Sequence, residues 1–434
     1  MLAAMPSPSA PLPPARNRDD ACPGALRLHS ADDGALARVR VPAGVLNTGQ
    51  ARALAGAAER LGDGSLHLTS RGNVQLRGLG EGCGGELAER LRAAELLPSP
   101  RHERVRNFVA SPLSGIDGSG RPEVQPWARS LDALVCGSEA AADLSGRFLF
   151  ALDDGRGDVA GLDADVTIVA ETGSPYAAVH LGGSWAVRVP AEEAPRAALA
   201  AAETFLATGR ESGTRAWRIR ELPDGGEALT REVVGRLVGE GMAAAPADAV
   251  LPRGSGPAPG PVEGPGGSRA LSVLAPLGRL TVAQWRLLTR IAHRDGRGEL
   301  RLTPWRGVVV PGLSGERAVR CLDDLRAAGL VTDSGSPWLG VGACTGRPGC
   351  AKSLADVRAD ACLSLTPPVP GGLPVYWSGC ERRCGHPRGD WVDVLATRDG
   401  YDIRAGGVRK HAALTGPTDL AAAIAAARTT PPTQ

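Results

Sequence analysis

The chain has 434 residues, enough for about two to four domains of ordinary size. Its 49 basic and 47 acidic residues leave a net charge of +2, which argues against a surface built mainly to bind nucleic acid. Aromatic residues make up only 3%, too few for platforms that stack bases, and no run of eighteen apolar residues could span a bilayer. We therefore expect neither a nucleic-acid partner nor a membrane partner.

The N-terminus and the cysteine content indicate the compartment. Residues 1–20 lack the basic and apolar regions of a signal peptide, and their Pro, Ser and Ala content is typical of a disordered leader. The nine cysteines are an odd number, so they do not suggest a disulfide framework. We therefore expect a cytoplasmic protein whose reduced cysteines can bind metals.

The sequence contains a repeat with a constant offset between its two copies. The segment LHLTSRGNVQLRGL at 66–79 corresponds to LRLTPWRGVVVPGL at 300–313, and LRAAEL at 91–96 corresponds to LRAAGL at 325–330. The same offset at separated places indicates a duplicated unit.

Each copy predicts the order strand, helix, strand, strand, helix. The first strands are expected at 37–41 and 270–275, and Thr48 and Thr281 are the expected helix N-caps. This order predicts an α+β fold with duplicated ferredoxin-like half-domains, which can pair about a pseudo-twofold axis and form a site between them.

The remaining chain divides at composition changes. Between the copies we expect strands at 147–152, 165–170, 176–181 and 185–189, followed by a helix from about 191 to 208. A Pro/Gly-rich segment then reads as an interdomain linker. The predicted organisation is a leader (1–20), a first half-domain (21–100), an α+β domain (101–250), a linker (252–268), a second half-domain (269–335) and a cysteine-rich domain (336–434).

Four cysteines form two closely spaced pairs near the C-terminus. Cys344 and Cys350 have five residues between them, and Cys380 and Cys384 have three. Four thiolates can hold a 4Fe-4S cluster, and the glycines beside each pair let the backbone bend around it. A structural zinc site is one alternative, although its paired ligands usually have two to four residues between them, and unrelated thiols are another. The other cysteines read as small apolar residues: Cys22, Cys83, Cys136, Cys321 and Cys362.

A row of polar residues lies within and around the first copy of the repeat. If the segment is a strand, its alternate residues share one face, and guanidinium forks on that face suit a ligand rich in carboxylates. A solvated edge strand is the alternative. The candidate binding residues are Arg40, Arg71, Asn73, Gln75, Arg77, Arg106 and Arg147.

Three features together resemble the nitrite/sulfite reductase superfamily: the row TSRGNVQLRGL, the segment RNFVASPLSG at 106–115, and the two cysteine pairs. In that superfamily, duplicated ferredoxin-like half-domains and further α/β domains surround a sirohaem and a 4Fe-4S cluster. Within it, CPGALRLHSADDGALARVRVPAG at 22–44 and LSGRFLFALDDGRGD at 144–158 resemble the branch that converts precorrin-3A to precorrin-3B in aerobic cobalamin biosynthesis.

This resemblance implies an oxygen-dependent monooxygenase that hydroxylates C20 of precorrin-3A and closes a γ-lactone. The ancestral sirohaem pocket would then bind a polycarboxylate tetrapyrrole as substrate, and residues 101–250 would form a macrocycle-binding domain. The four paired cysteines match the cluster ligands, Arg71 and Gln75 match contacts to macrocycle carboxylates, and Arg40 and Arg106 extend that set. An external electron donor is expected, because the chain contains no convincing nucleotide-binding motif of its own.

Arg147 and Leu149 fall where the superfamily's reductases carry two active-site lysines. A leucine cannot donate a proton or bind an anion, so this departure favours the oxygenase over a sirohaem nitrite or sulfite reductase, which is the alternative. A redox sensor or tetrapyrrole carrier is a third reading. The resemblance also implies a mononuclear non-haem iron, for which His386 is a candidate ligand unless it is an ordinary loop histidine. No catalytic residue is assigned.

Overall fold

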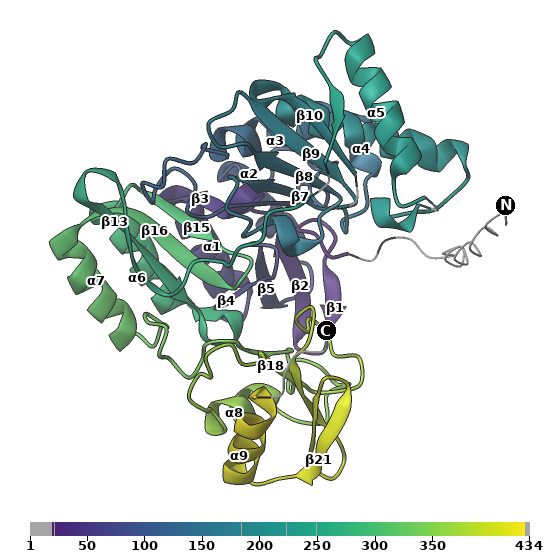
Figure 1. Cartoon of the computed structure of the whole chain (residues 1–434). Helices are drawn as coiled ribbons and strands as arrows, with labels where there is room; N and C mark the ends of the chain where they lie inside the picture. Colours follow the sequence, from purple (N-terminus) through teal and green to yellow (C-terminus); the bar gives the residue numbers. More distant parts are fainter. Residues whose placement is uncertain (1–19, 21, 184, 223, 249, 430–434) are drawn as a thin grey trace. The chain divides into compact units, whose positions relative to one another are not determined.

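The computed structural model describes residues 20, 22–183, 185–222, 224–248 and 250–429, so the predicted leader lies almost entirely outside the described residues. The chain forms two compact units, which are treated separately below (Figure 1). Unit 1 comprises Met1–Cys22, Ser99–Gly115 and Ser119–Ser255, and unit 2 comprises Pro23–Pro98, Ile116–Gly118 and Gly256–Gln434.

Unit 2 contains both copies of the repeat, and their elements follow one order. The first half-domain consists of β1 (His29–Ala31), β2 (Gly34–Val39), β3 (Val45–Asn47), α1 (Thr48–Leu61), β4 (Ser65–Leu68), β5 (Val74–Leu79) and α2 (Gly84–Ala93). The second consists of β12 (Gly260–Glu263), β13 (Ser268–Leu274), β14 (Arg279–Thr281), α6 (Val282–Arg294), β15 (Glu299–Leu302), β16 (Gly307–Ser314) and α7 (Gly315–Ala327). The predicted duplication of an α+β half-domain is confirmed. The segment predicted as a linker contributes β12 to the second sheet.

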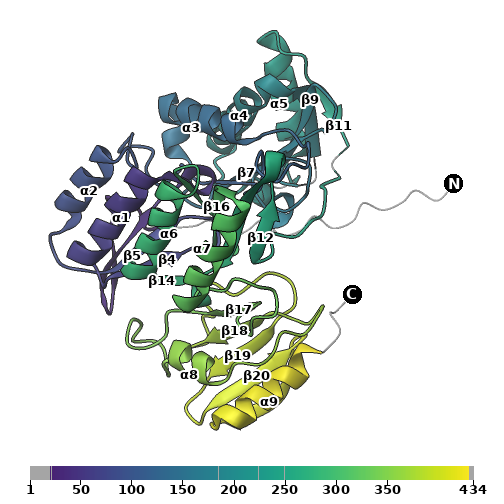
Figure 2. The same ribbon diagram turned by 90° about the vertical axis from the view of Figure 1, so that its left-hand side faces the viewer.

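The two half-domains exchange a short strand. The sheets have the orders β1-β2-β5-β4-β14 and β12-β13-β16-β15-β3, so each one ends in a strand from the other half-domain. Figure 2 shows the first of these sheets, with β14 beside β4. β14 pairs antiparallel with β4, and β3 pairs in the same way with β15. This reciprocal pairing gives the half-domains their pseudo-twofold relation.

The correspondence between the two copies extends to the backbone conformation. Gly44 and its counterpart Gly278 have φ angles of 73° and 72°. A Cβ atom on Gly44 would lie 2.0 Å from the carbonyl oxygen of Leu302, so the close approach of the half-domains requires glycine there.

Both long helices of the repeat begin with a capping box. Thr281 caps α6 as predicted, and its side chain accepts a hydrogen bond from the Gln284 N–H. In the first half-domain the cap is Asn47 rather than Thr48, because the Asn47 side chain accepts from the Gln50 N–H and Thr48 already lies in the helix. The prediction of Thr48 as an N-cap was wrong by one residue.

One apolar core serves both half-domains. It includes residues of α1 and α6, which lie side by side (Figure 2). Trp285 of α6 is fully buried, and its indole N–H donates to the carbonyl of Ala51 in α1 at 2.8 Å. A shared core of this kind makes the half-domains interdependent for stability.

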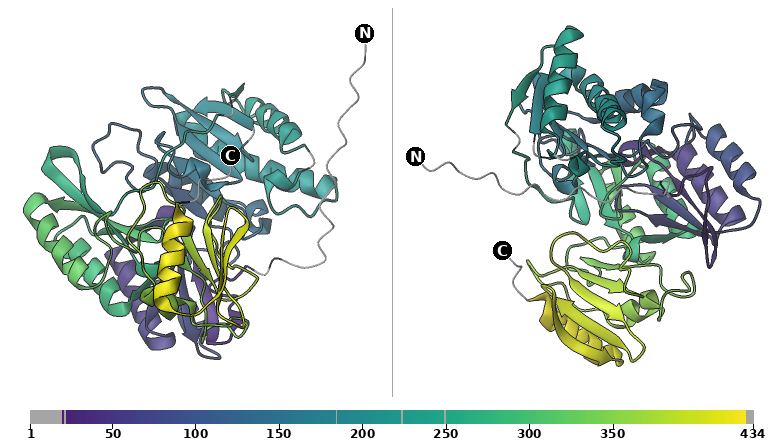
Figure 3. Two further views of the ribbon diagram at one scale, coloured as in Figure 1. Left: turned by 60° about the horizontal axis from the view of Figure 1, so that its bottom comes forward. Right: turned by 90° about the vertical axis from the view of Figure 1, so that its right-hand side faces the viewer.

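The C-terminal part of unit 2 has its own sheet and core. Its elements are β17 (Val341–Ala343), α8 (Val357–Leu363), β18 (Val375–Ser378), β19 (Val392–Ala396), β20 (Tyr401–Ala405), β21 (Val408–Leu414) and α9 (Pro417–Arg428). The strand order is β17-β18-β19-β20-β21, and the first three strands are parallel. α9 packs along this sheet (Figure 3).

Unit 1 is a second α+β body around a six-stranded sheet of order β11-β10-β9-β8-β7-β6. Its elements are β6 (Phe108–Ala110), α3 (Gln125–Gly137), β7 (Phe150–Asp153), β8 (Val166–Ala170), β9 (Tyr176–Leu181), β10 (Trp185–Pro190), α4 (Ala194–Glu211), α5 (Glu227–Gly239) and β11 (Ala245–Ala247). The four predicted strands and the predicted helix are confirmed, with small shifts at their ends. In the described part of both units, every helix is too short or too polar to cross a bilayer.

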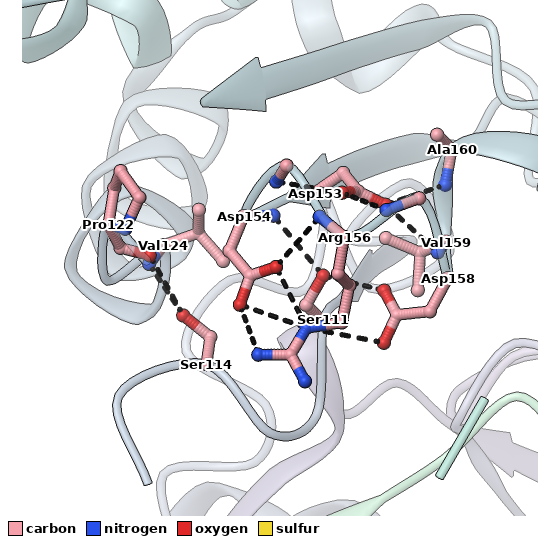
Figure 4. Close-up of polar contacts among 12 residues, drawn as sticks. Ser111, Ser114, Pro122, Val124, Asp153, Asp154, Arg156, Asp158, Val159 and Ala160 are labelled. Atoms are coloured by element: carbon pink, nitrogen blue, oxygen red, sulfur yellow. Dashed lines mark hydrogen bonds and ion pairs between the residues drawn. The ribbon is translucent and has the colours of Figure 1, made fainter. Parts of the chain in front are cut away.

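The loop after β7 carries a buried polar cluster (Figure 4). The Asp153 carboxylate accepts hydrogen bonds from four backbone N–H groups, those of Gly155, Gly157, Val159 and Ala160. Close by, the Ser111 hydroxyl donates to Asp158 at 2.6 Å. Both aspartates are buried, so this loop is held rigidly against the sheet.

Candidate functional site

The two cysteine pairs leave the C-terminal sheet at the same edge. Cys344 directly follows β17, and Cys380 lies two residues beyond β18. These strands are parallel neighbours, and the Cys344 N–H donates to the carbonyl of Trp377 in β18 at 2.9 Å. Because the carboxyl ends of adjacent parallel strands meet at one edge, the first cysteine of each pair is placed there by the sheet itself.

The second cysteine of each pair is folded back toward this edge. The Ser353 N–H donates to the Cys350 carbonyl at 3.0 Å, and the next residue, Leu354, donates to the carbonyl of Gly379 at 2.8 Å. Tyr376 of β18 donates from its hydroxyl to the Cys384 carbonyl at 2.6 Å. The structure therefore brings the two pairs together, although a long stretch of sequence that includes α8 lies between them.

The thiol of Cys344 lies in an environment suited to a bound thiolate. Burial raises the pKa of this thiol, the N–H groups of Gly379 and Gly346 lower it, and the nearby Cys384 and Cys380 thiols raise it again. The Gly379 N–H lies 3.2 Å from the Cys344 sulfur. Backbone N–H donors to sulfur are typical of iron–sulfur sites.

The spacing of the donors bears on the choice between zinc and a cluster. Within the described residues, no three His, Cys, Asp or Glu side chains converge closely enough to hold a metal ion. Zinc draws all its thiolate ligands to within about 2.3 Å of one point. A 4Fe-4S cluster takes one thiolate at each of four separate irons, so its ligands need not converge on one point.

A half-buried arginine supports the same assignment. Arg358 of α8 donates from Nε to the Cys344 carbonyl at 3.1 Å, and its Nη1 lies 3.4 Å from His67 Nδ1. Burial lowers the pKa of Arg358, Arg279 and Arg77 lower it further, and Cys344 raises it. Among the described residues, no carboxylate pairs with Arg358. An uncompensated cation beside Cys344 suits a group to which four thiolates contribute negative charge.

The predicted strand face of arginines is wrong at its beginning. β5 starts at Val74, so Arg71 and Asn73 lie in the turn after β4 rather than in the strand. The Asn73 side chain is fully buried, and its oxygen accepts a hydrogen bond from the Val41 N–H at 2.9 Å. This contact fixes the turn, and it explains why an asparagine occurs there without requiring a ligand.

Gln75 and Arg77 do lie on β5, and both contact other parts of the protein. Gln75 accepts a hydrogen bond from Arg38 at 3.3 Å. Arg77 is buried and donates twice to Asp33, at 2.8 and 2.7 Å, and once to the carbonyl of Gly349 at 2.9 Å. Arg77 thus contacts the segment that carries Cys350.

The other predicted carboxylate contacts fall in different settings. Arg40 follows β2 in unit 2 and is 2% exposed. Arg106 belongs to unit 1, where it makes a two-point ion pair with Asp132 at 2.7 and 2.6 Å. Arg147, also in unit 1, is exposed with its guanidinium 4.9 Å from the centre of the Trp217 ring. Contacts of these residues and of Arg71 with a ligand stay predictions.

His386 is exposed in the loop after Cys384. Its ring stacks on Trp391 with centroids 4.5 Å apart, and Nδ1 lies 2.7 Å from the Pro387 carbonyl. Both contacts are those of an ordinary loop histidine. The non-haem iron stays a prediction without an assigned ligand set.

Sequence reasoning missed three residues that surround the cysteines: Arg358, and Asp32 and Asp33 of the β1–β2 turn. No spacing rule pointed to Arg358. The Asp-Asp-Gly sequence at 32–34 is a recognisable turn signal, but a turn signal does not reveal that its side chains reach a segment near the other end of the chain.

Fold and site define an α+β protein with two interlocked ferredoxin-like half-domains and four cysteines gathered at one sheet edge. The family described as Nitrite/Sulfite reductase ferredoxin-like half domain matches residues 29–94 and 262–328. The two matched segments coincide with the two half-domains, so both half-domains resemble this family.

Relatives extend the similarity over most of the chain. Ferredoxin--nitrite reductase of Synechococcus elongatus is 26% identical over 419 residues, covering 86% of this chain and 80% of that protein. Precorrin-3B synthase of a Sinorhizobium species is 26% identical over 399 residues, covering 90% and 83%. The solved structure of Mycobacterium tuberculosis NirA superposes with a TM-score of 0.68 at 19% identity, covering 89% of this chain and 79% of that chain, and so supports the fold.

Proposed function

We propose that the chain is an iron–sulfur oxidoreductase acting on a polycarboxylate tetrapyrrole, and specifically a precorrin-3B synthase. It would convert precorrin-3A to precorrin-3B by hydroxylation at C20 and closure of a γ-lactone. One atom of molecular oxygen would enter the macrocycle, and the other would leave as water with two electrons and two protons. A separate reduced protein, such as a ferredoxin, would supply the electrons.

In this proposal Cys344, Cys350, Cys380 and Cys384 hold the 4Fe-4S cluster. The bound cluster supplies electrons one at a time. Arg358 offsets part of the negative charge of the thiolates beside Cys344, and the Gly379 N–H stabilises that sulfur. Arg71 and Arg40 would bind carboxylates of the macrocycle and exclude water from its reacting carbon.

The observation that carries the choice of an oxygenase is the burial of Leu149. This residue and Arg147 align with the two lysines that the superfamily's reductases are expected to use. Leu149 is 3% exposed, and its N–H donates to Asp165, so it is part of the core. The chain's only lysines are Lys352 and Lys410, in other segments. Without that pair of ammonium groups, the chain lacks the proton donors that six-electron reduction of nitrite or sulfite would draw on.

Ferredoxin--nitrite reductase is the second candidate. Its support is that most of the curated relatives carry this name, among them proteins of Leptolyngbya laminosa and Zea mays, each 28% identical. Under this alternative the protein would hold a sirohaem as cofactor instead of binding a tetrapyrrole substrate.

The test is turnover by protein purified without oxygen. Given precorrin-3A, a reductant and oxygen, it should form the lactone, and it should not consume nitrite under the same reducing conditions. Sharp porphyrin-type absorption bands together with nitrite reduction would overturn the proposal in favour of the reductase. Binding of precorrin-3A without a product would indicate a carrier.

A further inference from the structure

The β1–β2 hairpin turn consists of two aspartates that reach the cysteine-rich region. Ala31 pairs with Gly34, so Asp32 and Asp33 form the tip of the hairpin, and Gly34 has a φ angle of 110°. A two-residue turn projects both side chains from a backbone that the flanking strands hold in place. The tip is therefore closed by strand pairing, although it lies on the surface.

The two carboxylates contact the residues on either side of Cys350. Asp32 accepts a hydrogen bond from the Ala351 N–H at 2.6 Å. Asp33 receives two hydrogen bonds from Arg77, and the same guanidinium donates to the Gly349 carbonyl at 2.9 Å. The hairpin turn and Arg77 thus hold the backbone immediately before and immediately after this cysteine.

Gly349 confirms how close this approach is. A Cβ atom there would lie 2.8 Å from an Asp33 carboxylate oxygen and 2.7 Å from the Thr345 side chain. Any side chain would separate the loop from the turn, so glycine is required for the contact. The Arg77 side chain is 7% exposed and that of Asp33 is 24% exposed, which makes their ion pair less screened than a surface pair.

Cys350 needs such support more than the neighbouring cysteines do. Cys344 and Cys380 closely follow β17 and β18 and are placed by the sheet. Cys350 lies in a loop without helix or strand that ends where α8 begins at Val357. A ligand on a free loop loses conformational entropy when it binds a metal, and contacts that order the loop beforehand remove that cost.

We infer that the Asp32–Asp33 turn and Arg77 are the positioning element for Cys350. They hold its loop in the conformation that binds iron, and so they set how firmly the cluster is retained. Asp33 and Arg77 neutralise each other, so they order the loop without adding net charge beside the thiolates. The inference rests on the proposed 4Fe-4S cluster.

The test measures how fast a chelator removes iron from the full-length, cluster-loaded protein and from its variants. Asp32→Ala and Arg77→Gln should each release iron about tenfold faster or more, because each removes a charge-assisted hydrogen bond. Asp32→Asn keeps an oxygen acceptor but loses the charge, so its rate of iron release should lie between those of Asp32→Ala and the unaltered protein. Asp333→Ala is the matched control, since Asp333 is also exposed and accepts a backbone N–H, that of Gly335, at 2.9 Å.

A second measurement separates this inference from the proposed function. Hydrogen exchange of the Ala351 amide, measured in the cluster-free chain, should be faster in Asp32→Ala than in Asp32→Asn. If Asp32→Ala and Arg77→Gln bind a cluster and release its iron as slowly as the unaltered protein, the positioning role is wrong. The proposed cluster is then unaffected. A chain that never binds iron and sulfide overturns the cluster and with it any role toward Cys350, while the exchange rates still report whether the hairpin holds the loop.

Discussion

Replacing Asp158 with asparagine should change how the stability of the protein depends on pH. Asp158 is 4% exposed in the cluster of Figure 4, and burial, opposed by the Ser111 hydrogen bond and reinforced by Asp153, raises its pKa to about 7. Its ordinary value is 3.8. The folded chain therefore holds a proton that the unfolded chain releases between these two pH values.

The sign follows from linkage. A carboxyl whose pKa is raised on folding stabilises the folded state while it is protonated, and this stabilisation is lost as pH rises from 3.8 through about 7. Between pH 5 and pH 8 the loss amounts to about 2.5 kcal/mol, at 1.36 kcal/mol for each pKa unit. An asparagine side chain cannot titrate, so Asp158→Asn gains about this amount relative to the unaltered protein when both are moved from pH 5 to pH 8.

The assay is urea unfolding of both proteins at pH 5 and pH 8. The unfolding free energy of Asp158→Asn must be compared with that of the unaltered protein at each pH. The pH dependence of one protein alone also includes buried His180, whose contribution to stability grows as pH rises. An equal difference in unfolding free energy at the two pH values would refute the reasoning. It would mean that Asp158 is already ionised in the folded protein near neutral pH.

Three further predictions concern other parts of the chain. Burial lowers the pKa of His180 to about 4 from 6.5, so its contribution to stability is lost as pH falls from 6.5 toward 4, and His180→Asn should flatten the acid limb of a urea-stability profile. Gly44→Ala should destabilise the folded protein by about 3 kcal/mol, because its Cβ would meet the Leu302 carbonyl. Gly64→Ala is the control: Gly64 has a φ of 74° and open space around it, so this change should cost about 1 kcal/mol. Equal losses of unfolding free energy in urea would contradict the clash. Arg71→Ala should weaken binding of precorrin-3A by roughly 1.5–3 kcal/mol in an equilibrium titration, and unchanged affinity would remove Arg71 from the binding set.

The repeat could be recognised from the sequence because both copies keep similar residues at equivalent positions. β4 and β15 begin at equivalent positions of the two copies, Ser65 and Glu299, and positive-φ glycines recur at Gly44 and Gly278 and at Gly78 and Gly312. The exchange of β3 and β14 could not be read, since such short strands carry no pattern that says which sheet they join. Pairing of this kind depends on the shared core.

The candidate site was predictable in part, because the cysteines occur in two closely spaced pairs. The spacing of the cysteines predicted one site, and parallel pairing of β17 with β18 explains why distant pairs meet. The alternation at 71–77 misled, because a turn with a buried Asn73 mimics the period of a strand. Arg358 and the Asp32–Asp33 turn could not be found without the fold that brings them to the cysteines.

The central claim is that four cysteines at one sheet edge hold an iron–sulfur cluster. Iron and acid-labile sulfide, counted in protein purified without oxygen, test it most directly. The account predicts about four of each per chain, their loss in Cys380→Ser, and their retention in Cys362→Ser, which alters an exposed cysteine outside the predicted set. Full iron and sulfide in Cys380→Ser, or none in the unaltered chain, would contradict it.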